Sequence, residues 1–171
     1  TFKTITIIAK DKTNKYPAHA HALFLIKLFL SSLISVSIFL RYLSFLLSLY
    51  CCNNLKTLNI GESVKTIPAY AFYECTGLTE ITIPNSVSEI EYRAFYKCTA
   101  LTSITLPNSV TEIGEEAFAY CESLKEIRVE ATTTPAIQSS TFDNIEKSTP
   151  VYVPAGCGES YRSADYWSEF T

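Results

Sequence analysis

A near-copy of residues 78–100 follows that segment with no residue between the two. Pro84 and Phe95 of the first copy recur 23 positions later as Pro107 and Phe118. Another copy at the same offset precedes residue 78, and a further one begins at Leu124. A fixed period of this length indicates a stack of structural units, each of which contacts only its neighbours.

The first residues of each copy predict a short strand. Leu78, Ile81 and Ile83 are apolar and the residues between them are polar, which suits a strand with one buried face. Pro84 and Asn85 then end it, because proline has no N–H for a ladder and asparagine favours tight turns. One such unit buries too little apolar surface to offset an ordering free energy of ~1–2 kcal/mol per residue. Stacking on neighbours therefore supplies the missing burial.

The second half of each copy predicts a compact return path. Val87 and Ile90 form an apolar anchor, and alanine, phenylalanine and cysteine follow at spacings that suit one helical turn with these side chains inward. We expect such single-turn helices at Ala71–Cys75, Ala94–Cys98 and Ala117–Cys121. The phenylalanines should form a buried column: Phe72, Phe95 and Phe118.

Four cysteines share this period, at Cys52, Cys75, Cys98 and Cys121. They are therefore expected to form a buried ladder of thiols that act as small apolar side chains. Disulfides between adjacent rungs stay open as an alternative in an oxidising compartment. Cys157 lies between two glycines and is expected to be an inert thiol on a loop.

The pattern L-x-x-I-x-I-P-x-S-V-x-x-I-x-x-x-A-F-x-x-C resembles the BspA-like leucine-rich repeat family, with full copies at 55–77, 78–100 and 101–123 and a fourth opening at Leu124. The first copy has Gly61 in place of the proline, which keeps a turn there. The resemblance implies an α/β fold, a right-handed leucine-rich-repeat solenoid with short parallel strands in one sheet, single-turn helices and a C-terminal cap. It also implies a bacterial protein, on the cell surface or secreted, that binds other macromolecules.

The repeat register defines three parts: 1–47 outside it, 48–130 within it, and 131–171 as a degenerate repeat and cap. In the last part, 151–153 is predicted to form a final strand that Pro154 closes. Four apolar residues at intervals of three then predict one face of an amphipathic helix: Tyr161, Ala164, Trp167 and Phe170. Such a segment would cover the apolar edge of the last coil.

The N-terminal part is strongly apolar and leaves three interpretations open. Residues 22–40 are near the length that spans a membrane, and basic flanking residues favour an inside N-terminus. The second interpretation is a buried helical N-cap of the solenoid. The third is a segment translated out of frame and joined to a genuine repeat array. The chain contains no methionine and begins at Thr1, so we expect it to be a piece of a longer protein.

Charge and motifs limit the function. Residues 1–52 carry a formal charge of +5, whereas the rest carries eight basic and sixteen acidic residues, or −8, which argues against nucleic-acid binding. His19 and His21 lack a third metal ligand, and Glu115-Glu116 is expected on a solvated turn. No nucleotide-binding or nucleophile motif occurs. We therefore predict a protein that is not an enzyme and needs no cofactor or metal.

The leading hypothesis is a binding module that recognises other proteins, such as host matrix or cell-surface proteins, or mediates adhesion. Stacked strands place their polar positions side by side on one face, which solenoids use for partners. The candidate binding residues are Thr79, Glu80, Thr82, Thr102, Ser103, Thr105, Lys125, Glu126 and Arg128, preceded in the first coil by Lys56, Thr57 and Asn59. The alternative is a structural spacer or display stalk for a domain missing from this chain.

Overall fold

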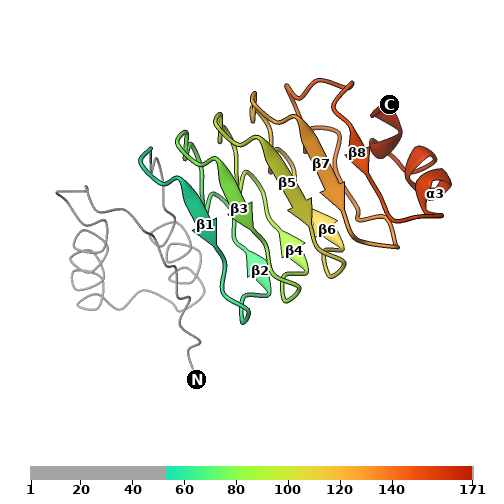
Figure 1. The fold of residues 1–171 in the computed structure, drawn as a ribbon, viewed down its shortest axis with the longest axis horizontal. Coiled ribbons are helices and arrows are strands. Elements are labelled where there is room, and N and C mark those ends of the chain that lie inside the picture. The colour runs from blue at the N-terminus through green and yellow to red at the C-terminus, as the bar shows by residue number, and fades with distance from the viewer. Residues whose placement is uncertain (1–52, 171) are drawn as a thin grey trace, which may run out of the picture.

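A computed structural model describes residues 53–170, and in it the leading segment of each repeat forms a short strand (Figure 1). The strands are β1 (Thr57–Asn59), β3 (Glu80–Thr82), β5 (Ser103–Leu106), β7 (Glu126–Val129) and β8 (Val151–Tyr152). Along β1 and β3 the side chains are exposed, buried and exposed in turn. The strand prediction for each leading segment is therefore confirmed.

These five strands lie in one row (Figure 1), and the hydrogen-bonded pairs among them, β1-β3, β5-β7 and β7-β8, are parallel. The pairing follows the repeat period, with Leu58 opposite Ile81 and Ile104 opposite Ile127. The hydrogen-bonded ladder is interrupted between β3 and β5, so the row consists of the sheets β1-β3 and β5-β7-β8 rather than the single predicted sheet. β3 and β5 still lie side by side. Ile81 and Ile104 of these two strands are both buried in the same apolar core.

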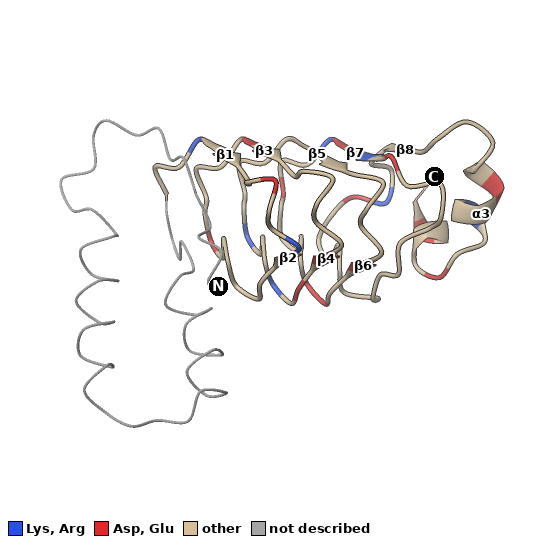
Figure 2. Cartoon of the chain, turned by 90° about the horizontal axis from the view of Figure 1, so that it is seen from below, with Lys and Arg blue, Asp and Glu red and all other residues tan. Residues whose placement is uncertain are grey.

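The return path of the coils forms a second parallel sheet that the sequence did not predict. It consists of β2 (Thr66–Ile67), β4 (Glu89–Ile90) and β6 (Glu112–Ile113), in that order. Figure 2 shows it along the edge of the coils opposite the first row. The isoleucine of each strand is buried, which confirms the apolar anchor on the return path.

Tight turns end the leading strands. The N–H of Val87 donates to the carbonyl of Pro84 at 3.0 Å, and Val110 donates in the same way to Pro107 at 3.1 Å. In the first described coil Val64 donates to Gly61 at 3.0 Å, so the glycine keeps the turn as expected.

The predicted single-turn helices are wrong, because these segments form successive turns instead. Alternate N–H groups leave the coil for the next one. Tyr73 donates within its own turn to Tyr70 at 3.2 Å, whereas Phe72 donates across to Ala94 at 2.8 Å and Glu74 to Tyr96 at 2.7 Å. A helix would use these N–H groups internally. Bonding between coils therefore replaces helical bonding.

Left-handed residues make this alternation geometrically accessible. Tyr70 and Glu74 have φ of 60° and 54°, and the equivalent Arg93 and Lys97 have 53° and 57°. The N–H of each of these residues donates to a carbonyl of the next coil, whereas the N–H of the residue that follows it donates within its own coil. The left-handed conformation costs about 1–2 kcal/mol for a residue with a Cβ, and the hydrogen bonds between coils offset this.

Ion pairs also link neighbouring coils on this side. The Arg93 guanidinium donates two hydrogen bonds of 3.0 Å to the Glu116 carboxylate, and Lys97 lies 3.5 Å from Glu74. The hydrogen bond from Arg93 to Glu116 raises the pKa of Arg93. Both pairs are partly solvated, so each contributes little to stability on its own.

The phenylalanine column is confirmed and is longer than predicted. Phe95 is fully buried between Phe72 and Phe118, with ring centroids 5.1 and 5.2 Å apart and planes within 15° and 6° of parallel. Phe142 extends the stack at 5.7 Å. It comes one position later than the repeat period would place it, and this shift hides it from a fixed-period search.

The cysteine ladder is confirmed for the described rungs Cys75, Cys98 and Cys121, all fully buried. The thiols of Cys98 and Cys121 donate to the carbonyls of Phe72 and Phe95, each at 3.3 Å, and neither forms a disulfide. Burial raises the pKa of Cys98 to about 12 and that of Cys121 well above its usual range. The fourth predicted rung, at position 52, lies outside the described residues.

The C-terminal segment packs on the last coil. The predicted single helix is wrong, because α3 (Gly158–Arg162) and the 3₁₀ helix η1 (Trp167–Glu169) are separated at Tyr166, whose φ is 62°. Two aromatic side chains of this segment donate to backbone carbonyls of the last coil. The Tyr161 hydroxyl donates to Ala131 at 2.7 Å, and the Trp167 indole N–H donates to Pro135 at 2.8 Å.

Several predictions fall on residues that the structure does not describe. They concern the apolar part at 1–47, the membrane segment at 22–40, and the histidines at 19 and 21. Among residues 53–170, no helix combines the length and apolar character needed to cross a bilayer.

Candidate binding face

The candidate residues predicted from the sequence lie along the row of leading strands, which we call the strand face. Two outward columns run along it at the strand register. One contains Thr57, Glu80, Ser103 and Glu126, and the other contains Asn59, Thr82, Thr105 and Arg128. A third column, just before the strands, contains Lys56, Thr79, Thr102 and Lys125. Ser103 and Glu126 are half-buried, and the other residues are exposed.

Backbone hydrogen bonds fix the third column. The N–H of Thr79 donates to the carbonyl of Lys56 at 2.9 Å, and the N–H of Lys125 donates to Thr102 at 2.9 Å. The Thr79 hydroxyl also donates to the Lys56 carbonyl at 2.9 Å. The polar side chains therefore project from a backbone held in register, and a partner would not have to order it.

The C-terminal end of the strand face differs from the rest. Arg128 donates to both carboxylate oxygens of Glu126, at 3.1 and 3.3 Å, and these bonds raise its pKa. The guanidinium carbon also lies 4.7 Å from the centre of the Tyr152 ring. Tyr152 is 48% exposed. The three residues form an ordered aromatic and charged cluster at the end of a hydroxyl-rich surface.

Tyr152 is the residue that sequence reasoning missed on this face. The strand at 151–153 was predicted, but its pairing partner was not. β8 pairs with β7 so that Tyr152 lies opposite Arg128, one position beyond the repeat period. The alternation of Val151, Tyr152 and Val153 was the available signal, because the middle residue of such a strand faces outward when its neighbours pack inward.

Among the described residues, the remaining candidate groups of the sequence lie in separate environments. Glu116 pairs with Arg93 at 3.0 Å, whereas Glu115 is exposed. Cys157 is half-buried, and its thiol lies 3.6 Å from the carbonyl of Thr132. Within residues 53–170, no three His, Cys, Asp or Glu side chains are arranged to hold a metal ion.

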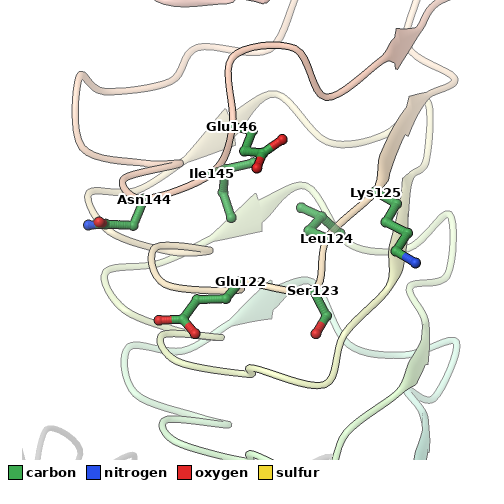
Figure 3. Close-up of a pocket in the computed structure, with 7 residues that line it drawn as sticks. All are labelled: Glu122, Ser123, Leu124, Lys125, Asn144, Ile145 and Glu146. Carbon is green, nitrogen blue, oxygen red and sulfur yellow. The ribbon is translucent and has the colours of Figure 1, made fainter.

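A shallow pocket of about 370 Å³ lies where the turns before β7 and β8 meet (Figure 3). Glu122 and Ser123 line it from one coil, and Asn144 and Glu146 line it from the next. In Figure 3 these polar side chains spread outward around the pocket rather than converge on a common point. The pocket therefore offers no constellation that would grip a small ligand.

A known repeat family matches most of the chain. A family model described as "BspA type Leucine rich repeat region" matches residues 47–166 in six copies. No curated protein sequence matches the chain.

Three solved structures are similar to part of the chain. A leucine-rich cell surface protein from Faecalibacterium prausnitzii is 41% identical over 51% of this chain and 23% of its own, with a TM-score of 0.47. A leucine-rich repeat protein of T. pallidum is 29% identical over 61% of this chain and 41% of its own, with a TM-score of 0.45. A leucine-rich repeat protein from Eubacterium ventriosum is 36% identical over 44% of this chain and 20% of its own, with a TM-score of 0.42. The chain spans less than half the length of each.

Proposed function

The chain belongs to the BspA type leucine-rich repeat family, and from that premise we propose that its strand face binds another protein. The observation that carries the proposal is the continuity of this face. Its polar columns are exposed over successive coils, while the alternate residues of the same strands are buried. Extended faces of this kind are the surfaces that solenoids use for partners.

The chemistry of the face favours a protein partner. Threonine and serine hydroxyls both donate and accept hydrogen bonds, so they suit the backbone and polar side chains of another polypeptide. Tyr152 and Arg128 at one end belong to the residue types enriched at the energetic centres of protein interfaces. Because the Arg128 side chain is already held by Glu126 and the Tyr152 ring, binding would order it at little cost in entropy.

A charge-matched pair of variants tests the face. Thr82→Lys with Thr105→Lys places two cations on the strand face, and Ser88→Lys with Thr111→Lys places the same two cations on the exposed return path. Each protein is tested for capture by immobilised host matrix proteins, after circular dichroism has shown that it folds. Loss of capture by the first variant alone supports the proposal.

Equal capture by both variants contradicts the proposal and leaves the structural spacer as the remaining function. Equal loss in both contradicts it as well, because the capture then depends on net charge and not on a face. A second comparison tests the aromatic end. Tyr152→Ala should weaken binding about tenfold or more, as for a residue at the centre of an interface. Tyr166→Ala, at an exposed tyrosine of the C-terminal segment, should leave affinity unchanged.

We also propose that the protein acts at the bacterial cell surface or after secretion, without catalysis. The proposal follows from the repeat family. Labelling of intact cells with a membrane-impermeant amine reagent tests the location, since Lys56 and Lys125 are exposed. Modification of the protein only after lysis would contradict it.

A further inference from the structure

Five partly buried tyrosines gather on the side of the coils formed by the successive turns, away from the strand face: Tyr70, Tyr73, Tyr92, Tyr96 and Tyr120. Their rings contact one another across three coils. None of the five lies on the strand face. The five residues are called the tyrosine cluster.

One pair in the tyrosine cluster has near-parallel rings. The rings of Tyr73 and Tyr96 have centroids 5.0 Å apart and planes within 12° of parallel. The backbone holds them there, because the N–H of Glu74 donates to the carbonyl of Tyr96 at 2.7 Å. The two phenol rings therefore lie face to face in adjacent coils. By contrast, Tyr70 and Tyr92 meet edge to face, at 5.3 Å and 90°.

The same geometry makes the tyrosine cluster a poor platform for a ligand. Aromatic recognition of sugars or apolar groups needs an open ring face, whereas Tyr73 and Tyr96 cover a face of each other. The guanidinium of Arg93 lies 4.9 Å from the Tyr96 ring centre, and the Lys97 ammonium lies 5.4 Å from it. Both cations are paired with carboxylates of the neighbouring coils. The distinguishing feature of the tyrosine cluster is therefore the contact between two phenol rings, and not an open ring face.

We propose that Tyr73 and Tyr96 form an oxidative cross-linking site, where hydrogen peroxide used by a haem peroxidase joins them as dityrosine. Each phenol loses one electron and its hydroxyl proton and becomes a neutral phenoxyl radical. Loss of the proton is favoured here, because the cations of Arg93 and Lys97 beside the ring disfavour a ring radical cation. The unpaired electron of each radical is shared with its ortho carbons.

The two radicals then couple. A carbon–carbon bond forms between one ortho carbon of each ring, and each of these carbons releases its hydrogen as a proton while the ring oxygen regains one. The product contains two intact phenols joined directly and has lost two hydrogen atoms in all. The peroxide accepts the two electrons and two protons and becomes two molecules of water. The step therefore balances without any further reactant.

The consequence of this bond is a covalent link between two successive coils. Tyr73 and Tyr96 occupy the same position in adjacent repeats, so the bond closes a loop one full repeat in length. A cross-link of this span restricts the unfolded chain more than the folded one, in which the rings already touch. The linked protein is therefore expected to unfold at higher denaturant concentration.

Trypsin cleavage allows the bond to be mapped. Cleavage after Lys65, Arg93, Lys97 and Lys125 places Tyr96 alone in the peptide 94–97. Tyr73 lies in the peptide 66–93 with Tyr70 and Tyr92, so fragmentation of the joined peptide identifies which of the three is linked. The full chain is treated with hydrogen peroxide and a haem peroxidase, digested and analysed by mass spectrometry. We expect peptide 94–97 joined to 66–93, with a mass two hydrogens below their sum, from protein that runs as a monomer on a denaturing gel. A link of 94–97 to 98–125 as the main product would overturn the proposal, because it would involve Tyr120 instead.

Variants separate this site from general tyrosine oxidation. Tyr73→Phe keeps a stacked ring but has no phenolic hydrogen, so the joined peptide should disappear and the rise in unfolding midpoint should disappear with it. Tyr166→Phe, at an exposed tyrosine of the C-terminal segment, should leave both unchanged. Persistence of the joined peptide in Tyr73→Phe, or the same yield from protein unfolded in urea before treatment, would overturn the proposal. So would a product found only as covalent dimers.

Discussion

Replacement of Phe95 by alanine is the most direct test of the repeat core. The ring is fully buried and stacks on Phe72 at 5.1 Å and on Phe118 at 5.2 Å. The carbonyl of Phe95 also accepts the hydrogen bond of the Cys121 thiol, so the substitution removes a ring from a tightly packed site. Because each coil stacks on its neighbours through this column, a gap here weakens two contacts between coils at once.

Phe95→Ala should lower the free energy of unfolding by about 4–5 kcal/mol, in the upper part of the range for a buried aromatic. Each of the two ring contacts contributes ~0.5–1.5 kcal/mol beyond the buried area, which places this residue above a core phenylalanine without aromatic neighbours. Phe95→Leu keeps most of the volume and loses only the stacking, so we expect a decrease of about 1–2 kcal/mol. A protein of ordinary stability, about 5–15 kcal/mol, would retain a measurable transition in the leucine variant.

Urea unfolding followed by circular dichroism provides the measurement, with the slope of the transition checked to be equal in all variants. Combining Phe95→Leu with Phe118→Leu should give a coupling energy of ~0.5–1.5 kcal/mol, since the two rings touch. A decrease below about 2 kcal/mol for Phe95→Ala would refute the reasoning, because the ring could not then be buried between two others. An alanine variant with the same free energy of unfolding as the leucine variant would also refute the reasoning.

Three further predictions concern other parts of the chain. Trp167→Phe should destabilise the protein by about 1–2 kcal/mol in urea unfolding, because the buried carbonyl of Pro135 loses its indole donor. Cys98 should resist a thiol-alkylating reagent at pH 8 until urea unfolds the protein. Because its pKa is raised, the folded state holds more protons than the unfolded state from about pH 9 to about 12. The stability of the protein should therefore fall as the pH rises through that window. Removal of residues 1–47 should leave a cooperative thermal transition, since each coil contacts only its neighbours, and a chain without any transition would show that this part is an integral N-cap.

The sequence was sufficient for the features that depend on local chemistry and on strict periodicity. The fixed offset between repeats identified the inward isoleucines, the phenylalanine column and the buried thiols, since burial must repeat when identical units stack. Pro84-Asn85 and Pro107-Asn108 identified where β3 and β5 end, and Gly61 marked the turn after β1. The polar columns of the strand face were also predicted, because alternation along a strand separates the buried side chains from the exposed ones. Their role in binding stays a prediction.

Only the tertiary structure decided the features in which neighbouring coils compete with local preference. The segment around Phe72 has spacings that suit a helix, but its N–H groups bond to the next coil and Tyr70 and Glu74 adopt left-handed φ angles. The fourth coil contains one more residue than the repeat period, so Phe142 falls outside that period. Its ring nevertheless stacks on Phe118 and extends the column.

The same distinction explains the two candidate surfaces. Tyr152 joins the strand face because β8 pairs with β7 beside Arg128, and Tyr73 meets Tyr96 because hydrogen bonds align two coils. Neither contact follows from the residues alone, since each depends on the register between chain segments that are a full repeat or more apart. Sequence by itself determined which side of each unit is apolar and how often it recurs. The hydrogen bonds and packing between coils determined which side chains meet.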